Sequence, residues 1–513
     1  MARLAASRRV PAALLDVLGE QQAALPASAA SQDNLQALAK GGVAVVATGQ
    51  QVGLFLGPLY TFYKAASAVA IARAIEAESG IRCVPLFWLQ TEDHDFAEIR
   101  TCVVAGTDGQ PVRLELAASN ETESRVSVAH RCLGAEIDTV LEQLDSLLAG
   151  QPGAEAVLAI LRAHYRPGRS IVAAFAGVLA TLFADEGLIF LDPRDPRVAA
   201  LAAPIYRSCI ESADSIERCL TERQTALAAA GFAVQVPVRR NCPLVFFHQG
   251  SAVGPRFRLH GMHTADGATH WGLPGTAETI AQDRLLAVLA REPLRFSTSA
   301  LLRPIVQDAL LPTVAYVGGP GEINYFAELS PLYQHFGVAP PLLVPRARFR
   351  CLDARTRRWL QQSGLRASDL AQPSHDIRAR LHPARPAGFP DPQELRDRIA
   401  GQILPAVEQV TAAISATGEY LHRPAQRTRD SVAHALELLI GRYTRDLVER
   451  DETTRRRLQQ LQMVLNPEGV AQERFYGWPW LAGRLGVARL KGLVIDRLQQ
   501  AGAFGTDVLE ISP

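Results

Sequence analysis

Four adjacent polar residues, 92–95 (EDHD), are the group in this chain best suited to move a proton. They follow an apolar run, residues 83–89, that predicts a buried strand. Carboxyl groups crowded beside an imidazole have raised pKa values, and they can supply a base or hold Mg²⁺. We expect Asp93, His94 and Asp95 to be catalytic and Glu92 to bind substrate. The competing interpretation is a solvated acidic turn.

A glycine-spaced loop follows another apolar run, residues 43–47, and precedes a helix that Pro58 opens. The loop matches neither the dinucleotide-binding fingerprint nor the Walker motif. Glycines nevertheless let a ligand approach the backbone closely, and a helix N-terminus offers free N–H groups to an anion. A structural turn is the alternative. The residues that we expect to bind substrate or nucleotide here are Thr48, Gly49, Gln50, Gln51, Gly53 and Gly57.

Lysine is rare in this chain. Lys40, Lys64 and Lys491 are the three lysines among 53 basic residues, which leaves fifty arginines. Lys64 lies within an apolar helical segment directly after the glycine-spaced loop. An ammonium group is a compact charge on a flexible stem, whereas guanidinium is a wide planar fork. We expect Lys64 to contact a phosphate or carboxylate; drift, or an ammonium that reaches solvent, is the alternative.

A third polar segment surrounds an apolar run at 312–317. The GGPG sequence after this run predicts a flexible bend before a helix, and such a bend can form a nest for an oxyanion or phosphate. Arg303 could grip a substrate carboxylate with its planar fork. Glu322 suits either a ligand contact or a cap in the first helical turn. The expected binding residues here are Arg303, Gln307, Asp308, Gly318, Gly319, Gly321, Glu322 and Asn324.

These segments require a common scaffold. Apolar runs at 187–192 and 341–346 predict two more buried strands, and helical patterns separate the strands along the chain. Alternation of this kind predicts an α/β fold with a parallel sheet. Because ligands bind at the carboxyl edge of such sheets, we expect the three polar segments to converge on one crevice.

Composition narrows the class of protein. The 513 residues suggest about three domains. A net charge of +1, with no basic run among aromatics, predicts no nucleic-acid partner. No apolar stretch is long enough to predict a membrane span. The seven scattered cysteines form no CxxC pair, which is typical of the reducing cytoplasm, and no metal-ligand spacing is present.

The chain changes character after Arg350. Two stretches, 393–421 and 426–464, have the apolar spacing of an antiparallel helical hairpin or coiled coil. The predicted segments are a first part of the core (1–130), a helical insertion (131–186), a core strand and helix (187–232), a small α+β insertion (233–295), a second part of the core with the GGPG loop (296–350), the helical hairpin (351–465) and a C-terminal segment packed on the core (466–513).

Taken together, these segments resemble one family, the cysteine ligase of bacillithiol biosynthesis, or cysteine-adding enzyme. The resemblance follows the family's order and covers most of the chain from the first strand onward. The residues that carry it are TGQQVGLFLGPLYTFYKA (48–65), VPLFWLQTEDHDFAEI (84–99), GLIFLDPRDP (187–196), LLRPIVQDALLPTVAYVGGPGEINYFAEL (301–329) and PEGVAQERFYG (467–477).

The resemblance implies a Rossmann-like core with connecting insertions and a C-terminal α-helical coiled-coil domain that pairs two subunits. It implies that cysteine is joined to glucosaminyl-malate, giving a low-molecular-weight thiol. The family's core is similar to class I nucleotidyltransferases and aminoacyl-tRNA synthetases, which implies ATP, with Mg²⁺, as the activating co-substrate. Those enzymes use a HIGH-type loop and a lysine-rich loop. This chain has neither, so the sequence leaves the activation of the carboxyl group open.

We therefore expect an enzyme that forms an amide bond between the carboxyl group of cysteine and the amine of glucosaminyl-malate. Two other classes stay open. One is a different ATP-dependent ligase or nucleotidyltransferase that uses the same core with another amine acceptor. The other is a non-catalytic coiled-coil scaffold, which the polar residues at three separate strand ends disfavour.

Overall fold

A computed structural model describes residues 1–106, 109–118, 125–263, 269–372, 376–378, 381, 388–502, 504–505 and 507–512. The chain divides into two compact units. Unit 1 contains residues 1–349 and 476–511, and unit 2 contains residues 350–475 and 512–513. The polar segments singled out from the sequence all lie in unit 1.

Unit 1 is built on one five-stranded sheet in the order β13-β12-β1-β2-β5, and every neighbouring pair is parallel. Its strands are the five apolar runs predicted from the sequence. Their bounds are Ala44–Gln50 (β1), Cys83–Leu89 (β2), Ile189–Leu191 (β5), Thr313–Gly318 (β12) and Leu342–Pro345 (β13). The Rossmann-like fold class is therefore confirmed.

The first strand is longer than its apolar run suggests. Pairing with β2 continues as far as Gln50 opposite Leu89, so Thr48 and Gly49 belong to the strand and not to the loop. The Thr48 hydroxyl donates to the Val317 carbonyl at 2.8 Å. Gly49 allows a close approach, because an added Cβ would lie 2.9 Å from the Trp88 carbonyl oxygen.

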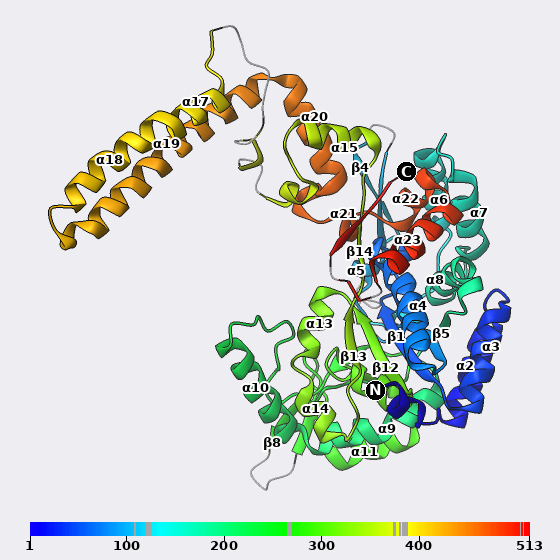
Figure 1. The fold of residues 1–513 in the computed structure, drawn as a ribbon. Coiled ribbons are helices and arrows are strands. Elements are labelled where there is room, and N and C mark those ends of the chain that lie inside the picture. Colours follow the sequence, from blue (N-terminus) through cyan, green and yellow to red (C-terminus); the bar gives the residue numbers. More distant parts are fainter. Residues whose placement is uncertain are drawn as a thin grey trace. The chain divides into compact units, whose positions relative to one another are not determined.

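Each face of the sheet is covered by helices (Figure 1). Alternate residues of a strand point to opposite faces. Ala44 and Val46 accordingly pack with Ala68 and Ile71 of helix α4 (Tyr60–Ser79), whereas Val45 and its alternates join the larger core on the other face. Both faces are thus buried, which explains why these strands read as continuous apolar runs.

The other helices of unit 1 surround this sheet (Figure 1). They are α1 (Ala2–Ala6), α2 (Ala12–Ala23), α3 (Ala29–Lys40), α5 (Phe96–Ile99), α6 (Glu136–Leu148), α7 (Ala154–His164), α8 (Ile171–Leu182), α9 (Pro196–Glu211), α10 (Ala213–Ala229), α11 (Gln282–Arg291), α12 (Arg303–Leu310), α13 (Pro320–Phe326), α14 (Ser330–His335), α22 (Trp478–Leu485) and α23 (Val487–Ala501).

Smaller antiparallel sheets lie outside the main one. One has the order β11-β6-β7, a second has the order β10-β9-β8, and β3 pairs with β4. These strands are β3 (Thr101–Ala105), β4 (Pro111–Glu115), β6 (Val245–His248), β7 (Arg256–Arg258), β8 (His260–His263), β9 (Thr269–Gly272), β10 (Thr279–Ala281) and β11 (Phe296–Thr298), and β15 (Val508–Ile511) also belongs to unit 1.

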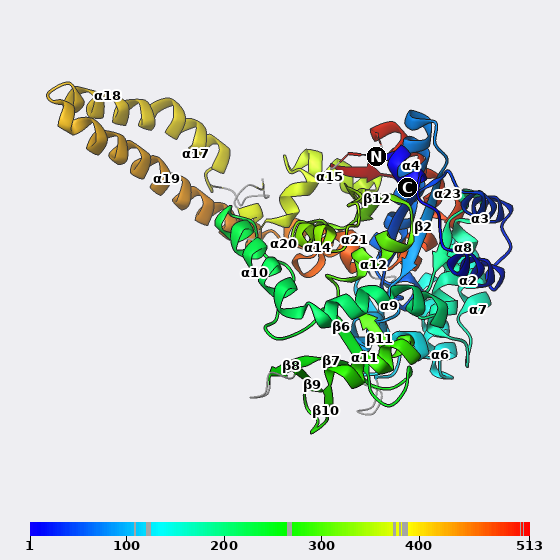
Figure 2. The ribbon, with the colours of Figure 1, turned by 90° about the horizontal axis from the view of Figure 1, so that it is seen from below.

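Unit 2 is helical and begins within strand β14 (Arg348–Cys351). Figure 2 shows α18 and α19 as two long helices side by side, and they pack against each other. The second predicted stretch, 426–464, is not one helix, because Asp451 caps a new helix at that point. The helices are α15 (Ala354–Gln362), α17 (Pro392–Arg398), a π-helical turn (Ile399–Ile403), α18 (Leu404–Ser415), α19 (His422–Arg450), α20 (Glu452–Leu465) and α21 (Gln472–Phe475).

Candidate functional site

The sheet order reverses between β1 and β12. From β1 the chain builds outward through β2 and β5, and it then returns to add β12 and β13 on the other side of β1. Ligands of open α/β sheets bind at the carboxyl ends of the strands around such a switch point. The loops after β1, β2 and β12 all begin at this edge, and they carry the three polar segments.

The ammonium group of Lys64 is fully engaged within the protein. It donates to the Gly49 carbonyl at 2.8 Å and to Gln50 Oε1 at 2.9 Å, and it forms an ion pair with Glu322. An ammonium has three donors, and these three acceptors use them all. The structure thus gives Lys64 a partner within the chain in place of the expected contact with a ligand.

Glu322 is both a cap and an ion-pair partner. Its carboxylate accepts from the Gly319 backbone N–H at 2.8 Å and from the Tyr316 hydroxyl at 2.7 Å. Burial acts to raise the pKa of Glu322, but the charge of Lys64 and these hydrogen bonds outweigh it and lower that pKa. Glu322 is therefore held as a carboxylate. Within the GGPG bend, the Gly319 N–H is therefore occupied by Glu322 and is not free for a ligand.

Arg303, Gln307 and Asp308 form a second buried chain of contacts. Arg303 donates to Gln307 Oε1 at 3.0 Å, and Gln307 donates to Asp308 Oδ1 at 2.9 Å. The Tyr316 and Tyr333 hydroxyls complete the chain, and all three predicted residues are buried. None of the three is among the residues that line the pocket at Asp93. Arg303 is linked instead to the Lys64–Glu322 pair through the Tyr316 hydroxyl. Asn324 is exposed and Gly321 has open space around it.

The middle of the glycine-spaced loop is apolar and buried. Leu54, Phe55 and Leu56 are fully buried, and the last two adopt positive φ angles of 51° and 74°. Gly53 and Gly57 allow this tight turn, because an added Cβ on Gly53 would lie 3.0 Å from the Gly57 Cα. At the far end of the loop, the Leu59 N–H before helix α4 already donates to the Tyr476 carbonyl at 2.8 Å. The polar side chains that the loop offers to a ligand are those at its start.

Gln51 connects the first loop to the loop after β2. Its side-chain amide donates to Asp93 Oδ2 at 3.2 Å. The acidic segment therefore lies beside the first glycine-spaced loop at the same sheet edge, and it does not lie on an opposite rim.

The four residues of the acidic segment have different environments. Glu92 is buried and accepts hydrogen bonds from the backbone N–H and hydroxyl of Thr298, and burial raises its pKa. Asp95 is exposed and caps the short helix α5 by accepting from the Glu98 N–H at 3.2 Å. Asp93 and His94 line a pocket. Of the three expected catalytic residues, two lie together in a cavity and Asp95 does not.

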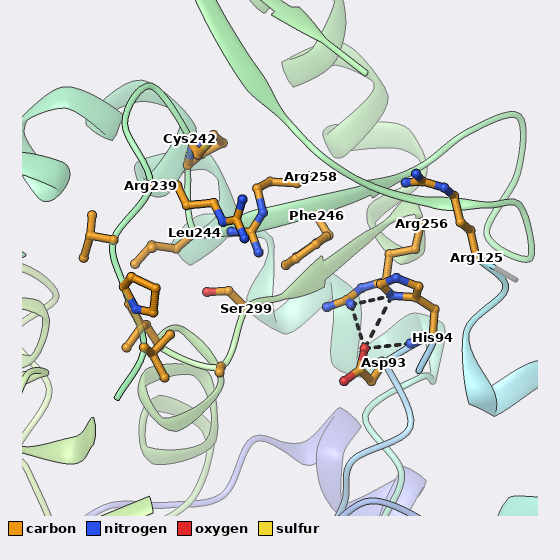
Figure 3. A pocket seen from close by; sticks show the side chains of 16 residues that line it. Asp93, His94, Arg125, Arg239, Cys242, Leu244, Phe246, Arg256, Arg258 and Ser299 are labelled. Carbon is orange, nitrogen blue, oxygen red and sulfur yellow. Dashed lines mark hydrogen bonds and ion pairs between the residues drawn. The ribbon is translucent and has the colours of Figure 1, made fainter. Parts of the chain in front are cut away.

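Asp93 is a carboxylate held by cationic and amide donors. Oδ1 accepts from the His94 N–H at 2.7 Å and from Arg256 Nη1 at 3.1 Å. Burial acts to raise the pKa of Asp93, but hydrogen bonds with His94 and the charge of Arg256 hold that pKa well below its usual range. His94 Nδ1 lies 3.4 Å from Asp93 Oδ1 and accepts from Arg256 at 3.1 Å (Figure 3). Because a guanidinium can only donate, the Nδ1 lone pair of His94 faces Arg256.

The pocket has a volume of about 480 Å³, within the range of small-molecule sites. Its walls come from the loop after β2, the small β6-β7 sheet and the segment before α12 (Figure 3). The lining residues are Asp93, His94, Arg125, Val236, Pro237, Val238, Arg239, Cys242, Pro243, Leu244, Phe246, Arg256, Arg258, Ser299, Ala300 and Leu301.

Arg256 is fixed by a network that also sets the tautomer of His248. Arg256 Nε donates to the Ser297 hydroxyl at 3.1 Å, and its guanidinium lies 3.7 Å from the centre of the Phe246 ring. His248 Nδ1 faces the Gly254 carbonyl, which can only accept, so Nδ1 carries the proton and Nε2 accepts from Ser297. Burial lowers the pKa of His248 to about 2, which keeps the ring neutral.

The sequence did not single out the arginines of this pocket. Arg239, Arg256 and Arg258 lie in the segment predicted as a small insertion, far along the chain from Asp93. Arg256 and Arg258 are two residues apart on a strand, so both side chains leave the same face. This two-residue spacing was the signal in the sequence that could have indicated an arginine-lined pocket. It is not distinctive in a chain with fifty arginines.

Among the described residues, the His, Cys, Asp and Glu side chains form no group of three or more that could hold a metal ion. None of the helices in this part of the chain is both long and apolar enough to cross a membrane.

A parallel sheet of this order, with a polar pocket beside its carboxyl edge, defines a Rossmann-like α/β protein. The family model "Bacillithiol biosynthesis BshC, N-terminal Rossmann-like domain" matches residues 2–347. The chain belongs to this BshC family of bacillithiol biosynthesis.

Curated relatives match over most of their length. The protein of Koribacter versatilis is 32% identical over 94% of this chain and 86% of its own length. The protein of Solibacter usitatus is 33% identical over 92% of this chain and 86% of its own length. The protein of Salinibacter ruber is 31% identical over 90% of this chain and 82% of its own length. All three are named "Putative cysteine ligase BshC", so the family is one of ligases.

Among solved structures, the methionyl-tRNA synthetase of Mycobacterium tuberculosis in complex with methionyl-adenylate matches at 12% identity and a TM-score of 0.21. The match covers 90% of this chain and 92% of that one. A likeness this low carries no argument about fold or ligand.

Proposed function

We propose that this chain joins the carboxyl group of cysteine to the amine of glucosaminyl-malate in bacillithiol biosynthesis. The observation that carries the proposal is membership of the BshC family over residues 2–347, together with named cysteine ligases that match most of the chain. The Asp93–His94 pocket supplies a place for the amine, because it combines a carboxylate with an imidazole ring.

The amine must lose a proton before it can attack. An ammonium group would bind against Asp93, which stays ionised because its pKa is held low. His94 lines the same pocket and takes the proton as general base. The resulting imidazolium lies beside Asp93, so its charge is compensated. The free amine then attacks the activated cysteine carboxyl and the C–N bond forms. The activating group leaves with the electron pair of its C–O bond, and the second proton of the nitrogen passes to the leaving phosphate oxygen or to water.

Carboxylate and amine do not condense unaided in water, so the cysteine carboxyl needs an activating group. We propose ATP as its source. Because the described side chains form no metal cluster, any Mg²⁺ would be held chiefly by the nucleotide phosphates. Formation of AMP or of ADP during turnover distinguishes an acyl-adenylate from an acyl-phosphate intermediate.

The direct test is an assay of the purified protein with glucosaminyl-malate, cysteine and ATP, in which loss of the free amine is followed. Amide product that depends on all three compounds is the expected result. Folded protein that gives no product with any nucleoside triphosphate would overturn the proposed reaction. Pyrophosphate release with an alternative amine would instead support a ligase with another acceptor.

We also propose that the helical hairpin of unit 2 pairs two copies of the chain. Val410 and Ile414 lie one turn apart on α18 with exposed fractions of 60% and 48%, and Leu439 on α19 is 64% exposed. Apolar side chains at helical spacing that are left open to water favour contact with another helix.

Replacing Val410 with aspartate is expected to convert a dimer into a monomer, because a charge would be buried in the apolar contact. Light scattering coupled to size-exclusion chromatography measures the mass. Gln409→Asp is the matched control, since it adds the same charge at the adjacent exposed position. A wild-type protein that is monomeric at high concentration would contradict this proposal.

A further inference from the structure

The two ends of the pocket differ in how their charges are satisfied. At one end, Asp93, His94 and Arg256 are mutually bonded, and Arg256 also donates to the Thr298 carbonyl at 2.8 Å. At the other end, Figure 3 shows the guanidinium groups of Arg239 and Arg258 turned toward each other, with Ser299 and Phe246 between them and Asp93. The pocket therefore has a neutralised end and a cationic end.

The cationic end has no counter-ion within the described residues. Neither Arg239 nor Arg258 forms an ion pair with a described carboxylate. The two guanidinium groups lie close enough for their positive charges to act on each other. Burial first, and then the charge of Arg239, lowers the pKa of Arg258. Two like charges held together beside an apolar wall destabilise each other unless an anion lies between them.

Arg258 is held in place by its strand and by an aromatic ring. Arg258 is paired with Phe246 across the β6-β7 ladder, and its guanidinium lies 4.8 Å from the centre of that ring. Arg256 covers the same ring at 3.7 Å. Stacking of this kind uses the face of a guanidinium and leaves its N–H edge free for a ligand. Arg239 is exposed, so an anion can reach the pair from solvent.

We propose that Arg239 and Arg258 form a dianion subsite that binds the two carboxylates of the malyl group, with the amine of the same acceptor at Asp93. This assignment rests on the proposed function, and it fixes the direction in which the acceptor enters. A planar guanidinium matches a carboxylate through two parallel hydrogen bonds, and two guanidinium groups match two carboxylates. Phosphate is the other dianion of this charge. Guanidinium groups bind phosphate and carboxylate alike, so the titrations below compare the two.

The test compares Arg239→Gln and Arg258→Gln with Arg240→Gln, which removes the same charge from an exposed residue that does not line the pocket. Isothermal titration with L-malate should show binding at least about tenfold weaker for the first two variants and unchanged for the third. L-malate diamide, which has no carboxylates, should not bind. Circular dichroism checks that each variant is folded.

Steady-state kinetics and a phosphate titration complete the test. With the full enzyme, Arg239→Gln and Arg258→Gln should raise KM for glucosaminyl-malate by at least about tenfold with kcat nearly unchanged. An unchanged KM in an active enzyme, or inorganic phosphate that binds this pair more tightly than malate, would overturn the subsite. If the wild type binds glucosaminyl-malate through these arginines but makes no amide, the subsite stands and the proposed reaction fails.

Discussion

Replacing Asp93 with asparagine is expected to lower kcat for amide formation at least about 100-fold, because His94 then works as a base without a compensating charge, and a positioned base contributes a rate factor of this size. Asparagine keeps the shape of the side chain but removes the charge that would attract the acceptor's ammonium. It also removes the compensation for an imidazolium at His94, whose Nδ1 lies 3.4 Å from Asp93 Oδ1. Initial rates of amine loss at saturating cysteine, ATP and glucosaminyl-malate measure the effect.

Asp95→Asn is the matched control. It makes the same chemical change two residues along the chain, and asparagine preserves the cap that Asp95 provides to α5. Because Asp95 is exposed and does not line the pocket, this variant should keep nearly the full rate. Equal losses in both variants would show that the pocket is not the site of the reaction, and a normal rate for Asp93→Asn would exclude its proposed role.

The pH dependence separates the functions of Asp93 and His94. The pKa of Asp93 is held below its usual range, so the carboxylate is present at any pH above that lowered value and is lost only in strong acid. Between about pH 5 and pH 9 its charge therefore does not change. The kcat profile of Asp93→Asn should be lower than that of the wild type but keep its acid limb. An acid limb that disappears in this variant would mean that Asp93 itself titrates there.

The sheet was predictable from the sequence, because its two buried faces leave a local signal. Each strand of the sheet is a short apolar run, and the strands are separated by helical patterns. The proximity of the first two polar loops could be predicted from the topology, because consecutive parallel strands end at the same edge of the sheet. The contact between Gln51 and Asp93 is the result.

The pocket was only half predictable. Asp93 and His94 follow directly after a strand, so their position at the sheet edge is a local property of the chain. The opposite wall comes from Arg239 and the β6-β7 sheet, about 150 residues further along. The packing of that insertion over the edge depends on tertiary contacts that no short pattern encodes. For this reason, the cationic end of the pocket could not be predicted from the sequence.

Side-chain roles were harder to predict than positions. Arg303, Gln307 and Asp308 have the polarity of ligand-binding residues, but their partners are one another and three tyrosine hydroxyls. The sequence left Glu322 open as a cap or a ligand, and the structure makes it a cap that also pairs with Lys64. A polar side chain before or after a strand is equally suited to a buried network and to a substrate, and only the full set of contacts separates the two.

The ion pair of Lys64 and Glu322 is such a buried network, and we expect it to contribute to the free energy of unfolding. Lys64→Met should lower the free energy of unfolding by about 3–5 kcal/mol, the cost of leaving one member of a buried ion pair without its partner. The exposed fractions of the two side chains are 3% and 17%, so water replaces little of the lost interaction. Urea denaturation followed by tryptophan fluorescence is the measurement, because Trp88, Trp271, Trp478 and Trp480 of the five tryptophans lie in unit 1.

The double variant Lys64→Met/Glu322→Gln distinguishes a buried pair from two independent residues. Removing both charges leaves no uncompensated group, so the loss of stability should be smaller than the sum of the two single losses. Lys64→Arg should also destabilise unit 1, because a wide guanidinium does not fit a slot formed by the Gly49 carbonyl, Gln50 and Glu322. Additive losses in the double variant would mean that the pair is not coupled. A fully stable Lys64→Arg protein would show that the retention of lysine among fifty arginines has another cause.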